Sequence, residues 1–118
     1  MQTYRGSCHC GKVQFEITTP PITKGLRCNC SLCVRKGAMM TPFTVPPENF
    51  RLLAGEQDQR LYQFGAKTAR HYFCVHCGVY PFHQPARAPT HYRANLGCLE
   101  GVDPTQLEAD LFDGRHLL

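Results

Sequence analysis

Cys28-Asn29-Cys30-Ser31-Leu32-Cys33 places three cysteines within six residues, and the basic pair Arg35 and Lys36 follows. Three closely spaced thiolates can hold a zinc ion and leave its fourth ligand position open. An open position distinguishes a reactive zinc site from a structural one, in which protein fills all four positions. We therefore expect the rest of the chain to be the scaffold that places this cluster.

The length and composition of the chain are typical of one small domain. The 118 residues allow a single domain, residues 1–118, with one hydrophobic core. Nine prolines and ten glycines predict short elements joined by many turns. The segment Met1–Arg5 shows no basic region leading into an apolar run, so we expect no signal peptide and a cytoplasmic protein. In a reducing compartment, cysteines bind metal more often than they form disulfides.

The charge balance argues against a nucleic-acid partner. The formal net charge of +4 counts all eight cysteines as neutral. Seven thiolates would remove seven charges and two Zn²⁺ ions would restore four, which leaves +1. The sequence contains no run of Lys and Arg with interleaved aromatic residues, the pattern that binds along a phosphate backbone. It also contains no apolar stretch as long as a membrane helix. We therefore expect neither a nucleic acid nor a membrane as partner.

The hydrophobic pattern predicts a mainly β protein. Residues 12–18 alternate strictly, with Val13, Phe15 and Ile17 on one face, which is typical of a half-buried strand. Ser31 is expected to cap a short helix that runs to Lys36 and ends at Gly37. Further strands are expected at residues 38–45 (interrupted by Pro42), 51–53, 61–64, 68–74, 79–83, 91–96 and 106–112. No segment shows sustained helical periodicity.

Four of the cysteines form two pairs that suit a closed metal site. The pairs lie in Cys8-His9-Cys10-Gly11 and Cys74-Val75-His76-Cys77-Gly78, and a glycine follows each pair at once. Glycine lets the chain turn tightly and aim backbone N–H groups at the sulfurs. Two such knuckles from distant parts of the chain predict a four-cysteine structural zinc site.

The cluster Cys28–Cys33 lacks the trailing glycine. If Ser31 caps a helix, Cys30 and Cys33 lie near its positive end, where the thiolate form is favoured. Three such ligands would leave a position for a water or a substrate thiol.

Other interpretations of the cysteines and histidines stay open. The cysteines would form disulfides if the protein were secreted. Cys98 would complete a second closed site as an eighth ligand, or it is a simple buried cysteine. His9 and His76 lie inside the knuckles and are further candidate ligands. The other four histidines, which are expected at or near the surface, are His71, His83, His91 and His116.

The chain resembles the glutathione-dependent formaldehyde-activating enzyme family, and within it the branch related to centromere protein V. The matching motifs are Gly6–Gly11, Cys28–Cys33 and His71–Gly78, with weaker matches at Asn95–Asp103 and Phe112–Gly114. The resemblance implies an Mss4-like fold of twisted antiparallel β-sheets that carries two zinc ions per chain. It assigns Cys8, Cys10, Cys74 and Cys77 to the structural zinc, and Cys28, Cys30 and Cys33 to the catalytic zinc.

The resemblance also implies an activity. The founding activity of the family joins glutathione to formaldehyde to give S-hydroxymethylglutathione, and it is classed as a carbon–sulfur lyase. A zinc with an open position could lower the pKa of the glutathione thiol or polarise the carbonyl of the aldehyde. Arg35 and Lys36 would meet the carboxylates of glutathione, or they would form a solvated helix face.

The motif departs from many family members at two positions. Many carry histidine between the first two cysteines of the cluster and arginine directly after the third, where this chain has Asn29 and Val34. Two other functions therefore stay open: a lyase acting on another small electrophile, and a non-catalytic zinc module that binds a protein partner. A fourth protein ligand at the cluster, from Cys98 or a histidine, would favour the module.

Overall fold

The structure, a computed structural model, describes residues 1–118 and is mainly β, as the sequence predicts. Its strands are β1 (Gln2–Ser7), β2 (Gln14–Thr19), β3 (Gly25–Cys28), β4 (Phe50–Ala54), β5 (Gln59–Tyr62), β6 (Arg70–Cys74), β7 (Phe82–Gln84), β8 (Arg93–Ala94) and β9 (Ala109–Phe112). Two short α-helices complete the fold, α1 (Ser31–Lys36) and α2 (Gly114–Leu117). Neither helix has the length or the apolar character needed to cross a membrane.

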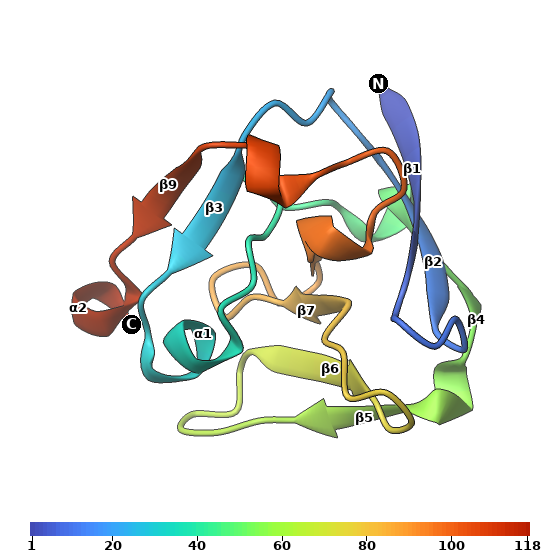
Figure 1. Ribbon diagram of the computed structural model, residues 1–118. Coiled ribbons are helices and arrows are strands. Elements are labelled where there is room, and N and C mark those ends of the chain that lie inside the picture. The colour runs from blue at the N-terminus through green and yellow to red at the C-terminus, as the bar shows by residue number, and fades with distance from the viewer.

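The strands form three small sheets (Figure 1). Two sheets are antiparallel, one in the order β1-β2-β4 and the other in the order β5-β6-β7-β8. The third is a parallel pair, β3 and β9, in which Gly25 is the partner of Ala109 and Cys28 the partner of Phe112. This pair draws the last strand of the chain alongside the segment that leads into the three-cysteine motif.

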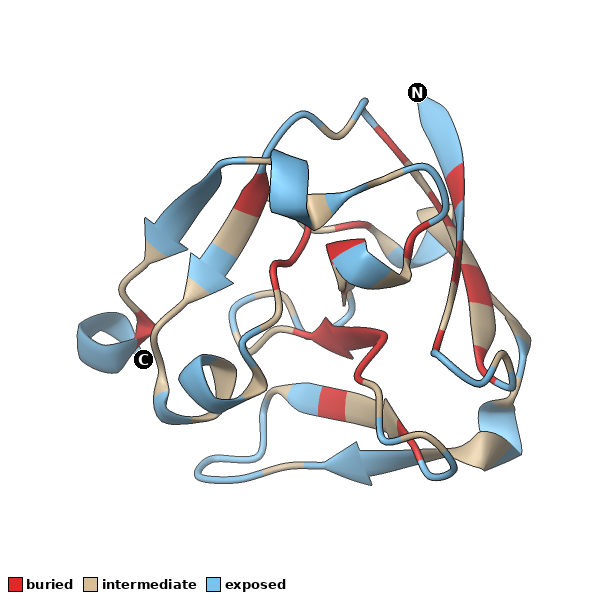
Figure 2. Cartoon of the chain, viewed as in Figure 1, coloured by how far each residue is buried: buried red, intermediate tan, exposed pale blue.

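The core lies where the two antiparallel sheets meet. Val13, Phe15 and Ile17 are completely buried, which confirms the face predicted for residues 12–18. Buried and half-buried positions alternate along β2 (Figure 2). Phe15 packs against Phe50 and Phe82, with ring centroids 5.8 and 5.3 Å apart. Such offset and edge-on aromatic contacts add to the stabilisation that burial provides. The core thus joins strands that belong to different sheets.

Two segments differ from the sequence prediction. Residues 38–45 do not form a regular strand and make only isolated bridges. Met40 pairs with Leu26 and with Asn95, and Val45 pairs with Tyr92. Pro42 has no N–H to donate, and the Thr41 hydroxyl donates to the Phe43 carbonyl at 3.0 Å, so the ladder is interrupted. Strand β1, with Tyr4 and Gly6 buried, was not anticipated.

Candidate metal centre and cavity

The eight cysteines sort into two clusters and one single residue. Sulfur atoms of Cys8, Cys10, Cys74 and Cys77 lie within 4.8 Å of one another, and so do those of Cys28, Cys30 and Cys33. All eight cysteines are free thiols. The structure therefore brings together the two sets that the spacing predicts, and the disulfide interpretation is wrong.

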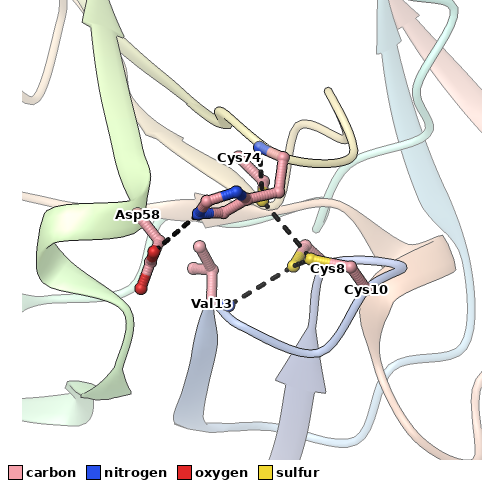
Figure 3. Close-up of polar contacts among 6 residues, drawn as sticks. Cys8, Cys10, Val13, Asp58 and Cys74 are labelled. Carbon is pink, nitrogen blue, oxygen red and sulfur yellow. Dashed lines mark hydrogen bonds and ion pairs between the residues drawn. The ribbon is translucent and has the colours of Figure 1, made fainter.

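The four-cysteine cluster joins the turn after β1 to the turn after β6. Gly11 and Gly78 have positive φ angles of 84° and 74°, as each knuckle requires. The N–H groups of Val13 and His76 donate to Cys8 Sγ and Cys74 Sγ at 3.3 and 3.4 Å (Figure 3). These bonds hold the sulfurs in place without using a side chain.

The sulfur spacing in this cluster suits one tetrahedral cation. Cys10 Sγ lies 3.6 Å from both Cys8 Sγ and Cys74 Sγ. Zinc–sulfur bonds of about 2.3 Å in a tetrahedron would place neighbouring sulfurs roughly 3.8 Å apart. The imidazole of His76 is held elsewhere, because its Nε2 contacts Asp58 Oδ1 at 2.7 Å (Figure 3). The donor set therefore fits a four-thiolate zinc site.

Cys98 belongs to neither cluster. It is half-buried, and its thiol faces the Tyr80 carbonyl at 4.0 Å. It lines a cleft of about 460 Å³ together with Cys8, on the side of the four-cysteine cluster. The interpretation in which Cys98 completes the three-cysteine cluster is therefore wrong.

The three-cysteine cluster forms where β3 ends and α1 begins. Cys28 is the last residue of β3, and Cys30 is the N-cap of α1, with its sulfur accepting from the N–H of Cys33 at 3.3 Å. The Cys28 sulfur accepts from the N–H of Cys30 at 3.4 Å. The predicted end of the helix at Lys36 is confirmed, with Gly37 as its C-cap at φ 65°, but the helix begins at Ser31 itself. The N-cap is Cys30 and not Ser31, because the Cys30 sulfur accepts the hydrogen bond from the N–H of Cys33.

The chemistry of this donor set fits a thiophilic cation. Burial raises the pKa of the Cys33 thiol to about 12. At neutral pH a bound cation is needed to hold such a thiol as thiolate. Cys28, Cys30 and Cys33 would hold the ion, and no histidine or carboxylate belongs to the cluster. The residues therefore leave the fourth position to a ligand from outside the protein.

A cavity of about 500 Å³ opens in front of this cluster. All three cysteines line it, together with the cationic side chains Lys36, Lys67, Arg87 and Arg93. No aspartate or glutamate lines it. Its electrostatics therefore favour an anionic ligand.

A chain of polar contacts crosses the inner wall of the cavity. Lys36 Nζ lies 3.0 Å from His71 Nδ1 and 3.4 Å from the centre of the Tyr80 ring. The Tyr80 hydroxyl contacts Nδ1 of both His71, at 3.4 Å, and His83. Burial lowers the pKa of Lys36 to about 8, against the opposing charge of the cysteines, and lowers the pKa of His71 to about 4. Within this group of contacts, Lys36 therefore carries the positive charge at neutral pH, and His71 and His83 are neutral.

These positions correct two expectations from the sequence. His71 and His83 are not at the surface: they are cross-strand partners in β6 and β7, and each is only 7% exposed. Of the basic pair, Lys36 faces the cavity, whereas Arg35 is exposed and donates to the Ser31 carbonyl at 2.7 Å. The pairing of His71 with His83 depends on strand register, which the spacing of histidines in the sequence does not reveal.

The C-terminal segment is fastened against the three-cysteine cluster. Asn29 donates to Asp113 Oδ1 and accepts from the N–H of Arg115, both at 2.9 Å. Gly114 packs so closely that a Cβ there would lie 2.6 Å from Cys28 Sγ. Residue 29 therefore acts in the structure as a tie between the cluster and α2, a role that its position between two cysteines does not suggest.

Comparison with known proteins finds one matching family and a similar solved structure. The model of the family described as glutathione-dependent formaldehyde-activating enzyme matches residues 3–114. A crystal structure of a Rhodobacter sphaeroides protein is similar, with a TM-score of 0.81 and 37% sequence identity. The match covers 90% of this chain and 99% of the Rhodobacter chain.

Proposed function

Because the chain belongs to the glutathione-dependent formaldehyde-activating enzyme family, we propose that it joins glutathione to formaldehyde, a carbon–sulfur lyase-type reaction. One observation carries the proposal: three cysteines without a fourth protein ligand line a cation-rich cavity. A structural metal site has no need of such a cavity. The same observation disfavours the non-catalytic module, for which a fully liganded metal was expected.

The two clusters have different roles in this proposal. Cys8, Cys10, Cys74 and Cys77 hold a structural zinc, and Cys28, Cys30 and Cys33 hold a catalytic one. When bound, the catalytic zinc supplies Lewis acidity, which lowers the pKa of a thiol or polarises a carbonyl. The hydrogen bonds to Cys28 and Cys30 orient these ligands toward the cavity.

The cations of the cavity bind the carboxylates of glutathione. Arg87 and Lys67 lie on exposed loops at the outer part of the cavity, where a charged peptide keeps contact with water. Arg93 lies deeper, and its Nη1 donates to the Thr41 carbonyl at 2.7 Å. This bond fixes the guanidinium and leaves its other N–H groups free to bind an anion. Arg35 has no part in binding, because it faces away from the cavity.

Lys36 supplies the proton that the addition requires. The sulfur of glutathione forms a bond to the aldehyde carbon, and the electron pair of the C=O π bond moves onto oxygen. Lys36 Nζ donates a proton to that oxygen, and the proton released from the thiol restores the ammonium. Its contacts with His71 and the Tyr80 ring hold Nζ at the cavity wall.

The proposal is tested by following adduct formation with the zinc-loaded protein. Exchange between free formaldehyde and S-hydroxymethylglutathione is measured by NMR, with and without protein. We expect the protein to accelerate exchange and to contain about two zinc ions per chain. We also expect that bound glutathione protects the three-cysteine cluster from an alkylating reagent. One zinc per chain, or no acceleration by fully loaded protein, would contradict the proposal.

A further inference from the structure

Two loops contribute a set of apolar residues to the outer wall of the cavity, next to the Lys67 and Arg87 side chains of the same loops. One loop follows β5 and contributes Phe64, Ala66 and Ala69, and the other follows β7 and contributes Ala86 and Ala88. None of these side chains carries a hydrogen-bonding group. Phe64 is 41% exposed although it is large and apolar, so its ring remains available for contact with a ligand.

The cysteine thiols and the Lys36 ammonium, on which the proposed addition depends, are grouped in the inner part of the cavity, whereas Lys67 and Arg87 lie on the loops of its outer part. In the inner part, Lys36 also contacts His71, and the Tyr80 hydroxyl contacts the histidine ring nitrogens. A reacting thiol and carbonyl would therefore sit at the inner end. A substituent on the carbonyl carbon would extend along the apolar residues of these loops.

Formaldehyde leaves this wall unused. A cavity of about 500 Å³ has room for on the order of 15 water-sized volumes, whereas formaldehyde has no substituent to place against the loops. The carboxylates of glutathione would pair with Lys67 and Arg87 on these loops, whereas Phe64 and the alanines offer its peptide groups no polar partner. An alkyl or aryl substituent would remove both its own surface and the wall from water.

We propose that this protein also accepts as its electrophile an aldehyde with an apolar substituent of several carbons, seated between the loops that contain Phe64 and Ala86. This inference rests on the proposed function and specifies its substrate class. The step is the same addition: the sulfur–carbon bond forms, the C=O π pair moves to oxygen, and oxygen takes a proton, with no oxidation or reduction.

Stable adduct analogues test this inference without relying on turnover. Binding of S-hexylglutathione and S-methylglutathione to the zinc-loaded protein is measured by calorimetry. Each buried methylene tightens binding about fourfold, so we expect the hexyl compound to bind at least tenfold more tightly. Turnover of glutathione with hexanal should likewise exceed turnover with formaldehyde at equal concentration.

Matched variants locate the effect. Phe64→Ser should reduce the preference for the hexyl compound at least threefold. Leu61→Ser should not change it, because Leu61 is similarly exposed, at 43%, but lies outside the cavity. Ala86→Asp provides a second test on the other loop and should weaken binding of the hexyl compound more than that of the methyl compound. Circular dichroism and zinc content establish that each variant is folded and loaded.

The outcomes separate this inference from the proposed function. Equal affinities, or tighter binding of S-methylglutathione, would overturn the apolar-substituent inference and leave glutathione binding intact. A preference that Phe64→Ser and Ala86→Asp both leave unchanged would also overturn it, because the substituent would then lie elsewhere. Failure of both compounds to bind would overturn the proposed function, and this inference with it.

Discussion

The four-cysteine cluster and the three-cysteine cluster use the same ligand atom in different surroundings. In the first, Cys8 and Cys74 are almost completely buried beside the core, and positive-φ glycines close both turns. In the second, the cysteines are half-buried and line a cavity of about 500 Å³ with Lys36. The difference is in the surroundings of the sulfurs: the first cluster combines buried Cys8 and Cys74 with exposed Cys10, whereas all three cysteines of the second line one cavity beside the Lys36 ammonium.

This comparison teaches that cysteine count alone does not make a metal site reactive. The backbone N–H groups that contact the sulfurs are similar in both clusters, at 3.3 to 3.4 Å. What differs is that one cluster holds two distant segments together, whereas the other lies within a single segment of six residues. Damage to the first should therefore affect folding, and damage to the second should affect chemistry.

The largest effect is expected from Cys77→Ala. A structural zinc site contributes roughly 10–16 kcal/mol in small zinc-binding peptides, which is comparable to the whole stability of a domain, about 5–15 kcal/mol. We expect loss of cooperative thermal unfolding in circular dichroism. Cys98→Ala is the control, because Cys98 lies outside both clusters, and it should unfold cooperatively. A cooperative transition in Cys77→Ala near that of the wild type would contradict the structural role.

Cys30→Ala should separate chemistry from folding. We expect this variant to lose one of two zinc ions, to lose adduct-forming activity at least 100-fold, and to keep its thermal transition within a few degrees. Metal analysis together with calorimetry measures all three quantities on one sample. Loss of both zinc ions would show that the clusters are not independent.

Lys36→Met should reduce the catalysed rate about 100-fold, in the range found for general acid–base groups, while zinc content stays constant. Because burial lowers the pKa of Lys36 to about 8, its ammonium is present below that pH and is lost above it. The rate catalysed by the wild type should therefore fall as pH rises through about 8. Lys36→Arg keeps its charge at high pH. A decline that persists near pH 8 in Lys36→Arg would show that another group causes it.

The smallest effect is expected from Gly114→Ala. The new Cβ would lie 2.6 Å from Cys28 Sγ, and overpacking of this kind costs about 1–3 kcal/mol. Competition with a chelator should show roughly tenfold weaker metal binding at the three-cysteine cluster and unchanged binding at the other. Gly97→Ala is the matched control, because its Cβ would meet nothing closer than 3.5 Å. Equal metal affinities in the two variants would refute the packing explanation.

Local sequence signals predicted the parts of the molecule that are built locally. The alternation around Phe15 identified the buried face of β2, and the stop at Gly37 identified the end of α1. Spacing and trailing glycines predicted both cysteine clusters that the structure brings together. The strand face, the helix end, each knuckle and the three-cysteine cluster depend on residues close together in the chain, where periodicity and turn chemistry are readable. The joining of the two distant knuckles follows from the four ligands that a structural zinc requires.

The features that escaped prediction depend on distant contacts. His71 and His83 meet because β6 and β7 pair in one register, and a shift by one residue would turn both side chains to the other face. Asn29 reaches Asp113 only because β9 lies beside β3. Lys36 and Arg35 are adjacent on a one-turn helix, and only the surrounding fold decides which of them faces the cavity.

The parallel pairing of β3 with β9 also bears on the order in which the molecule is completed during synthesis. Gly25 must wait for Ala109, a partner 84 positions later, whereas the last ligand of the four-cysteine cluster is Cys77. Contacts this distant form late, because the ends of a long loop must first be brought together. All four ligands of the structural cluster are therefore synthesised before β9, and we expect this cluster to close before the wall of the reactive cavity is complete.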